Sequence, residues 1–183
     1  MPRNSAPREH DEAPFSLGPL PLFARTGIGY DSHRFAPGKH ITLAGVAIPS
    51  SVMLVGHSDA DVVAHAIIDA VLGAAAAGDI GELFPNTDEE NRDRNSIEML
   101  RETVDLVHDR GYAVFQVDVT IVAESPAIAE HREAMRTALA QALQVPPSHV
   151  SVKGKTNEGM GWIGRGEGLA CIAVANVVPL PSA

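Results

Sequence analysis

Apolar and polar residues alternate with two different periods along this chain. Apolar side chains recur at helical spacing within residues 62–74 and again within residues 97–107, whereas residues 115–121 alternate strictly between apolar and polar. The first spacing is typical of a helix with one buried face, and the second is typical of a half-buried strand. We therefore predict a two-layer α/β domain in which helices pack on a sheet.

Capping and turn residues mark where these elements begin and end. Ser58 followed by Asp61 predicts a capping box at the start of the first helix, and Asn95 followed by Glu98 predicts another at the second. The first helix is expected to stop at Gly78. The remaining predicted elements are a strand over residues 25–30, two short strands within 41–49, a helix over 127–143, and strands over 150–156 and 168–178.

The last of these segments differs from the strand at 115–121, because residues 168–178 are apolar at almost every position. A strand that is apolar on both faces is typical of the centre of a sheet covered on both sides. We therefore expect residues 168–178 to form a central strand with packing on both faces.

Net charge, cysteine count and the length of apolar runs limit what this protein can bind and where it can be located. The chain has 183 residues and a formal net charge of −9, which argues against sequence-independent nucleic-acid binding because that requires a basic surface. Cys171 is the single cysteine, so no intrachain disulfide forms, and a reduced thiol favours a cytoplasmic protein. No apolar run is long enough to predict a membrane span.

Residues 1–24 are rich in proline and mixed in charge. We expect them to form a mobile extension ahead of one domain at residues 25–183.

Two short motifs contain residues that bind metals. G-Y-D-S-H places Asp31 and His33 two residues apart, which puts both side chains on the same side of an extended segment. In G-H-S-D-A-D-V-V-A-H, Asp61 and His65 are four residues apart and share one face of the predicted helix. Each motif alone also fits a cap or a solvated polar surface.

Two nitrogen ligands and one oxygen ligand, with one position left open, are typical of a catalytic zinc site. Several residues compete for these three places, and spacing does not choose among them. The candidates are His33, His57 and His65 for nitrogen, and Asp31, Asp59 and Asp61 for oxygen.

Two glycine-containing segments offer ligand-binding loops. Residues 78–88 read G-D-I-G-E-L-F-P-N-T-D and offer Asp79 with backbone groups to a polyhydroxyl ligand, although a plain helix exit and turn fits as well. Residues 153–168 hold six glycines around Lys155, Thr156 and Glu158. Glycine permits close backbone approach to a phosphate, and a carboxylate there suits Mg²⁺. The alternative is a glycine-rich hairpin with surface charges paired.

Together these motifs resemble the 2-C-methyl-D-erythritol 2,4-cyclodiphosphate synthase family over about residues 25–178. The resemblance is carried by G-Y-D-S-H, G-H-S-D-A-D-V-V-A-H, G-D-I-G-E-L-F-P-N-T-D, V-D-V-T-I-V-A-E-S-P and G-R-G-E-G-L-A. It implies a phosphorus–oxygen lyase that converts 4-CDP-2-C-methyl-D-erythritol 2-phosphate to the cyclic diphosphate and CMP, in the non-mevalonate isoprenoid pathway. It also implies a small mixed sheet of the Bacillus chorismate-mutase type, in a homotrimer whose sheets surround a threefold axis and whose active sites are shared between subunits.

The resemblance assigns roles to individual positions. It implies a Zn²⁺ or other divalent cation on Asp31, His33 and His65, and a Mg²⁺ or Mn²⁺ that bridges the diphosphate near Glu158. His57 and Thr156 would hold the phosphates and stabilise the transition state. The other substrate-binding positions that it implies are Ser32, Ser58, Asp79, Ile80, Gly81, Phe84, Pro85, Asn86, Thr87, Asp88, residues 123–129 (Ala123, Glu124, Ser125, Pro126, Ala127, Ile128 and Ala129), Lys155, Asn157, Trp162 and Arg165.

The family pattern also suggests an axial cavity for an isoprenoid diphosphate near Trp162 and Arg165. Lys155 and Asn157 stand where many members have threonine, and Trp162 stands where phenylalanine is common. Two other functions fit the same residues, namely a zinc-dependent phosphohydrolase and a non-catalytic trimeric ligand-binding protein of related fold.

Overall fold

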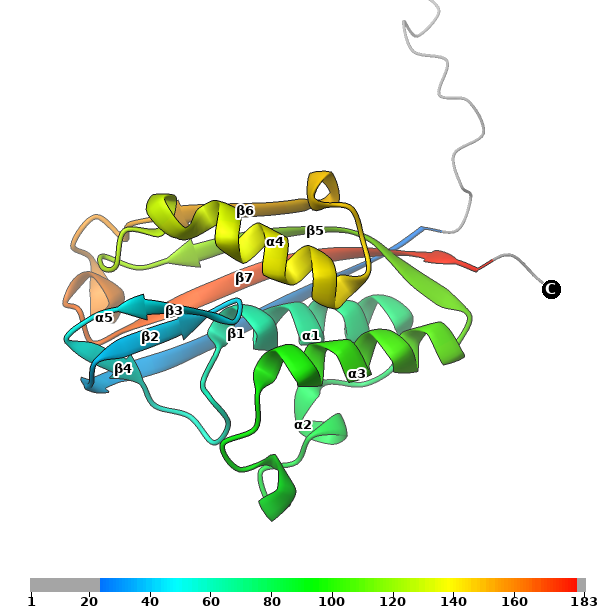
Figure 1. Cartoon of the computed structure of the whole chain (residues 1–183), viewed down its shortest axis with the longest axis horizontal. Coiled ribbons are helices and arrows are strands. Elements are labelled where there is room, and N and C mark those ends of the chain that lie inside the picture. The colour runs from blue at the N-terminus through cyan, green and yellow to red at the C-terminus, as the bar shows by residue number, and fades with distance from the viewer. Residues whose placement is uncertain (1–23, 181–183) are drawn as a thin grey trace, which may run out of the picture.

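Five strands form one mixed sheet, and helices pack along one of its faces in this computed structural model, which describes residues 24–180 (Figure 1). The predicted extension at 1–24 lies almost entirely outside the described residues. The sheet order is β4-β1-β7-β5-β6, and β2 and β3 form a separate hairpin. The strands are β1 (Arg25–Pro37), β2 (His40–Leu43), β3 (Val46–Pro49), β4 (Val52–Leu54), β5 (Tyr112–Val122), β6 (Val150–Lys155) and β7 (Gly168–Pro179).

Polar side chains cap the starts of α1, α2 and α3, although not always at the predicted residue. The α-helices are α1 (Val62–Ala75), α2 (Ile80–Leu83), α3 (Ser96–Asp109), α4 (Arg132–Leu143) and α5 (Gly161–Gly164), with 3₁₀ turns η1 (Glu89–Asn91), η2 (Ile128–His131) and η3 (Pro147–His149). Asn95 caps α3 as predicted. The cap of α1 is Asp61, which accepts from the amides of Val63 and Ala64. The predicted box starting at Ser58 is therefore wrong.

Two other predicted boundaries differ from the structure. The first helix ends at the left-handed residue Ala76 rather than at Gly78. The segment predicted as one helix over 127–143 divides into η2 and α4 at Arg132. None of the helices within residues 24–180 is both long and apolar enough to cross a membrane.

Glycines allow α1 to lie very close to β1. A Cβ atom at Gly27 would stand 2.0 Å from the backbone oxygen of Ala70, and one at Gly29 would stand 1.9 Å from that of Ala66. Any side chain at these positions would push the helix away from the strand. The contact brings His65, on the first turns of α1, over the part of β1 that carries Asp31.

The central position predicted for β7 is confirmed, and the predicted cover on its second face stays a prediction. β7 lies at the centre of the sheet, antiparallel to both β1 and β5. Within residues 24–180, however, helices cover one face only, and large apolar side chains lie open on the other. Ile28, Tyr30 and Ile172 are 72%, 56% and 39% exposed.

Candidate functional site

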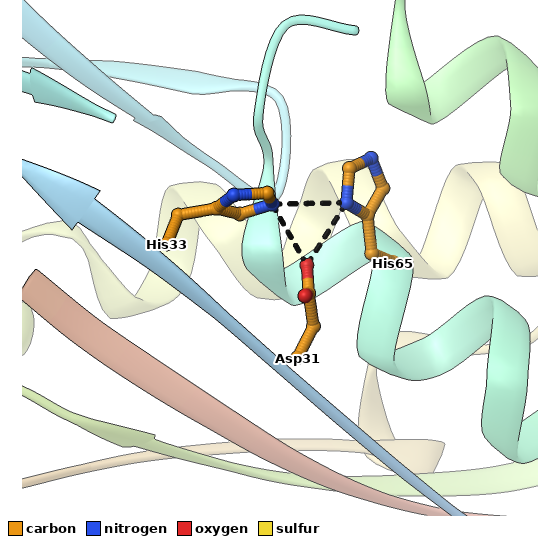
Figure 2. A group of neighbouring side chains, drawn as sticks. All are labelled: Asp31, His33 and His65. Carbon is orange, nitrogen blue, oxygen red and sulfur yellow. Dashed lines mark hydrogen bonds and ion pairs between the residues drawn. The ribbon is translucent and has the colours of Figure 1, made fainter. Parts of the chain in front are cut away.

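Three side chains from two elements converge on one point (Figure 2). The Oδ2 atom of Asp31 lies 3.0 Å from Nε2 of His33 and 2.9 Å from Nδ1 of His65. The two ring nitrogens are 3.4 Å apart. Asp31 and His33 point to the same side of β1, as their spacing predicts, and His65 meets them from α1.

A second layer of hydrogen bonds orients each of these side chains. The backbone amide of Ser32 donates to Asp31 Oδ1 at 2.8 Å, which leaves Oδ2 for the histidines. Nδ1 of His33 lies 2.9 Å from the carbonyl oxygen of Val55. Because a carbonyl can only accept, this nitrogen carries the proton, and Nε2 of His33 is left with a lone pair.

His65 is oriented by a chain of polar groups behind it. Its Nε2 atom lies 2.9 Å from the hydroxyl oxygen of Ser96 and 3.0 Å from that of Ser58. The hydroxyl of Ser96 donates to Asp59, and the amide of Ser96 donates to the other oxygen of Asp59 at 3.1 Å. The Ser96 oxygen is thus placed to accept the proton of Nε2, which turns Nδ1 of His65 toward Asp31.

The electrostatics of the cluster favour an ionised carboxylate. Burial raises the pKa of Asp31, but the hydrogen bonds and positive charge that His33 and His65 offer when their rings are protonated outweigh burial and hold that pKa well below its usual range. The neutral rings described above turn lone pairs toward the same point instead. For His33, burial lowers the pKa, and the hydrogen bond and charge of Asp31 more than compensate, so that its pKa is raised. Two imidazole nitrogens therefore meet at the negatively charged Oδ2 atom of Asp31.

The geometry of this cluster fits a divalent cation. The three donor atoms lie within 4.8 Å of one another. Ligand atoms about 2.0–2.1 Å from a tetrahedral zinc are roughly 3.3 Å apart, and the observed separations of 2.9, 3.0 and 3.4 Å are close to that. Two imidazoles and one carboxylate also form a donor set that zinc accepts, with one position left for a ligand.

The other residues that the sequence offered as metal ligands, Asp59, Asp61 and His57, lie outside the cluster. Asp61 is fully buried and caps α1. Asp59 binds Ser96. His57 lies outside the three-residue cluster, but it lines the same cavity, and its Nε2 atom is buried without a hydrogen-bond partner among the described residues.

The cluster lies at a cavity of about 200 Å³ between β1, α1, α2 and α3. We name it the metal cavity. Its lining residues are Asp31, His33, His57, Ser58, His65, Ile80, Gly81, Phe84, Asn86, Asn91 and Met99. Arg94 lies over the ring of Phe84, 5.1 Å from its centroid, and supports this wall.

A second cavity, of about 280 Å³, lies where the loop after β5 meets the end of β6. We name it the loop cavity. Its lining residues are Ala123, Glu124, Pro126, Ala127, Ile128, Ala129, Arg132, Gly154, Lys155 and Thr156. The walls are mainly small and apolar, and the cationic side chains of Arg132 and Lys155 are both exposed at its edge.

Comparison with known proteins identifies the family. The profile of the YgbB family matches residues 24–178. The chain belongs to this family. A 2-C-methyl-D-erythritol 2,4-cyclodiphosphate synthase of Gemmatimonas aurantiaca is 50% identical over 163 residues, which cover 89% of this chain and 98% of the relative.

Solved structures of related proteins have the same fold. The bifunctional IspDF of Campylobacter jejuni matches with a TM-score of 0.83 at 39% identity, over 86% of this chain and 42% of that longer chain. The IspF of Plasmodium falciparum, in a complex with CDP, matches with a TM-score of 0.76 at 35% identity, over 86% of this chain and 97% of that chain.

The substrate positions implied by the family resemblance divide between the two cavities. The metal cavity receives Asp31, His33, His57, Ser58, Ile80, Gly81, Phe84 and Asn86. The loop cavity receives Ala123, Glu124, Pro126, Ala127, Ile128, Ala129, Lys155 and Thr156. Neither lining includes Ser32, Asp79, Pro85, Thr87, Asp88, Ser125, Asn157, Glu158, Trp162 or Arg165.

Several of these remaining residues have local partners. Asp79 and Asp88 cap α2 and η1, accepting from the amides of Glu82 and Glu90. Arg165 donates from Nε to Glu167 at 2.6 Å, which is the surface pairing that the glycine-rich hairpin interpretation anticipates. This pairing belongs to the exposed end of α5.

Sequence reasoning missed Arg132 and Ser96. Arg132 opens α4 and borders the loop cavity, but it follows the quoted V-D-V-T-I-V-A-E-S-P motif by several residues. Ser96 stands just after the cap of α3, so the sequence suggests a helix start and gives no sign of its contact with His65.

Proposed function

We propose that this protein is a cyclodiphosphate synthase, which converts 4-CDP-2-C-methyl-D-erythritol 2-phosphate to 2-C-methyl-D-erythritol 2,4-cyclodiphosphate and CMP in isoprenoid precursor synthesis. The observation that carries the proposal is the convergence of Asp31, His33 and His65 in a cavity of a YgbB-family chain. Relatives with this name at about half identity, which the chain covers almost completely, support the same substrate.

The metal cavity would hold the diphosphate end of the substrate. Asp31, His33 and His65 would bind a Zn²⁺ or another divalent cation, and such a cation polarises a phosphoryl oxygen and orients the attack on phosphorus. His57 lines the same cavity, and its imidazole would donate to a phosphate oxygen. Gly81 and Asp79, at the start of α2, would face the methylerythritol hydroxyls.

The loop cavity would hold the cytidine. Its small apolar walls from Ala123 to Ala129 suit a flat base, and CDP is bound by the Plasmodium falciparum relative of the same fold. Thr156 and Lys155 at its edge would contact phosphates. Glu158, two residues beyond Thr156, would hold a Mg²⁺ or Mn²⁺ on the diphosphate, because that cation prefers carboxylate and phosphate oxygens.

We infer that the active protein is a homotrimer with shared active sites. The two cavities are separate in one chain and hold complementary parts of one substrate, so a second copy is needed to bring them together. The open sheet face supplies apolar side chains for such packing, with Ile28, Tyr30 and Ile172 exposed on it. Light scattering should give three times the monomer mass, and a monomer at micromolar concentration would refute the assembly.

Two further proposals concern the setting of the protein. We place it in the cytoplasm, because Cys171 is a single, free and buried cysteine and the chain can form no intrachain disulfide. In the trimer, Arg165 and Trp162 would border an axial cavity able to take an isoprenoid diphosphate. A map with Arg165 remote from the threefold axis would remove that second idea.

The reaction is tested by product analysis in water enriched in ¹⁸O. Cyclisation uses the substrate's own phosphate as the attacking group, so CMP and the cyclic diphosphate should form in equal amounts without solvent oxygen. A chelator should abolish the reaction, and added zinc should restore it. Stoichiometric ¹⁸O in CMP or in free phosphate would identify a metal-dependent phosphohydrolase instead. Turnover that is absent with zinc and Mg²⁺ present would favour a non-catalytic binding protein.

The metal assignment is tested by a matched pair of histidine variants. His65→Ala should lose both bound zinc and activity. His57→Ala should lose activity but keep stoichiometric zinc, because His57 lies outside the cluster. Zinc retained in the first variant and lost in the second would overturn the assignment.

A further inference from the structure

The carboxylate of Glu124 binds a second loop rather than standing free in the loop cavity. Glu124 follows the end of β5 by two residues. Its Oε1 atom accepts hydrogen bonds from the backbone amides of Asn157 at 3.0 Å and Gly159 at 3.1 Å. These partners are 33 and 35 residues along the chain, so the bonds connect two segments that are distant in sequence.

The second loop, residues 156–159, has a backbone conformation that a hydrogen-bond acceptor can stabilise. Glu158 has a φ of 51° and Gly159 a φ of 72°, both in the left-handed region. That region is sterically disfavoured for a residue with a Cβ atom, as Glu158 is. Left-handed residues turn neighbouring amides toward one side and create a concave site for an anion. Here the anion is the protein's own carboxylate.

Other contacts fix the same loop on its remaining sides. Gly164 lies against it so closely that a Cβ atom would stand 2.0 Å from the carbonyl carbon of Gly159. The side-chain amide of Asn157 donates to the carbonyl of Met160 at 2.7 Å. Glu124 therefore connects residues 157–159 of this loop to the segment that follows β5, beyond the backbone bond in which the amide of Ala123 donates to the carbonyl of Lys155 at 2.9 Å.

Thr156 and Glu158 flank the amide bound by Glu124. The hydroxyl of Thr156 donates to Oε1 of Glu158 at 2.9 Å, so the two side chains already lie together. Because the amides of Asn157 and Gly159 are occupied, they are not available to cradle a phosphate. What the loop offers a ligand is the set of side chains on Lys155, Thr156 and Glu158.

We propose that Glu124 is a positioning residue that holds Thr156 and Glu158 at the edge of the loop cavity. Its role is to link the wall of the nucleotide pocket to the loop that carries the phosphate and magnesium ligands. This inference rests on the proposed function for the roles of Thr156 and Glu158, although the hydrogen bonds themselves do not. Glu124 does not touch the reacting atoms and is not a catalytic residue.

The contact requires an acceptor at the Oε1 position rather than a charge. Glutamine keeps a carbonyl oxygen at the same reach, whereas alanine removes it. Glu124→Ala should release the loop, and Glu124→Gln should keep it in place. Glu130 provides a charge-matched control, because it is an exposed acid on η2, in the same segment, and accepts no side-chain hydrogen bond from residues 24–180.

Hydrogen exchange followed by mass spectrometry tests the bonds directly in the full-length protein. Peptides covering residues 155–161 should exchange about tenfold faster in Glu124→Ala, equivalent to ~1.4 kcal/mol of lost protection. The rates should stay at the wild-type level in Glu124→Gln and in Glu130→Ala. Unchanged exchange in Glu124→Ala would overturn the proposal, and so would equal acceleration in Glu124→Gln, because a charge rather than an acceptor would then be responsible.

Steady-state kinetics then test the consequence for the site. In Glu124→Ala the Mg²⁺ concentration for half-maximal rate should rise about tenfold, ~1.4 kcal/mol, while bound zinc and the thermal midpoint stay unchanged. A purely structural role would lower the thermal midpoint and leave the Mg²⁺ dependence alone, and that result would overturn the proposal. If the wild-type protein forms linear products, the proposed function fails, while the exchange experiment still decides the role of Glu124.

Discussion

Asp61 joins two parts of the fold through one buried carboxylate. Its Oδ1 atom accepts from the amide of Ala44 at 2.8 Å and from those of Val63 and Ala64 at 3.1 and 3.2 Å. Its Oδ2 atom accepts from the amide of Gly45 at 2.6 Å. The side chain thus caps α1 and also fixes the turn between β2 and β3. We predict that Asp61→Ala destabilises the protein more than loss of an ordinary cap.

The expected loss follows from counting these bonds. Removing a helix cap costs about 1 kcal/mol. The amides of Ala44 and Gly45 would also lose their partner, at about 1–3 kcal/mol each. Burial raises the pKa of Asp61, and backbone hydrogen bonds from Gly45, Ala44 and Ala64 counter only part of that effect. Because the variant is relieved of a buried charge, we expect the lower part of the summed range, about 3 kcal/mol.

Asn95 provides the matched control. It caps α3 through the amides of Ile97 and Glu98 and has no second segment to fix. Asn95→Ala should therefore cost about 1 kcal/mol, and Asp61→Asn should fall between the two alanine variants because it keeps one acceptor oxygen.

Urea unfolding monitored by circular dichroism gives these differences from the midpoint and slope of each transition. A clear gap between Asp61→Ala and Asn95→Ala measures the contribution of the turn between β2 and β3. Equal losses in the two variants would refute the argument, because the bonds to that turn would then add nothing.

Three further changes test the packing, the metal cluster and the loop cavity. Gly29→Ala should lower the free energy of unfolding by about 3 kcal/mol, because its Cβ atom would meet the backbone oxygen of Ala66 at 1.9 Å; a melting temperature like that of the wild type would contradict this. Ser96→Ala should weaken zinc binding about 10–100-fold in a chelator competition, and unchanged affinity would show that Ser96 does not orient His65. Arg132→Ala should raise the Kd for CDP about tenfold in calorimetry, whereas Arg101→Ala on α3 should not, and equal effects would indicate general charge rather than a pocket contact.

The metal cluster shows what local spacing can predict. A separation of two in an extended segment puts Asp31 and His33 on one side of β1, and this geometry is independent of the rest of the fold. Spacing could not choose between Asp31, Asp59 and Asp61 as the carboxylate, since all three stand beside histidines. The family resemblance favoured Asp31. In the structure, the deciding factor is the close approach of α1 to β1 across Gly27 and Gly29, which is a tertiary contact.

Capping residues show a different limit. Asn95 follows the simple rule, and its helix begins where the sequence predicts. Asp61 also stands at a helix start, but the sequence suggested it as the last residue of a capping box led by Ser58, three positions earlier. Its burial and its bonds to Ala44 and Gly45 depend on a hairpin 16 and 17 residues earlier in the chain. Glu124 is a similar case, since its partners are more than thirty residues away.

The open face of the sheet bears on two features of this protein: the apolar sequence of β7 and the separation of the metal cavity from the loop cavity. Residues 168–178 are apolar on both faces, and no helix within residues 24–180 covers the face on which Ile172 is exposed. The exposed Ile28 and Tyr30 on the neighbouring β1 continue that surface. Burying such side chains is favourable, so this face is expected to pack against a surface outside residues 24–180 of the same chain. The two cavities also remain apart within one chain. Packing of identical sheets would satisfy both conditions at once, because the apolar face would be covered and the metal cavity of one copy could meet the loop cavity of the next.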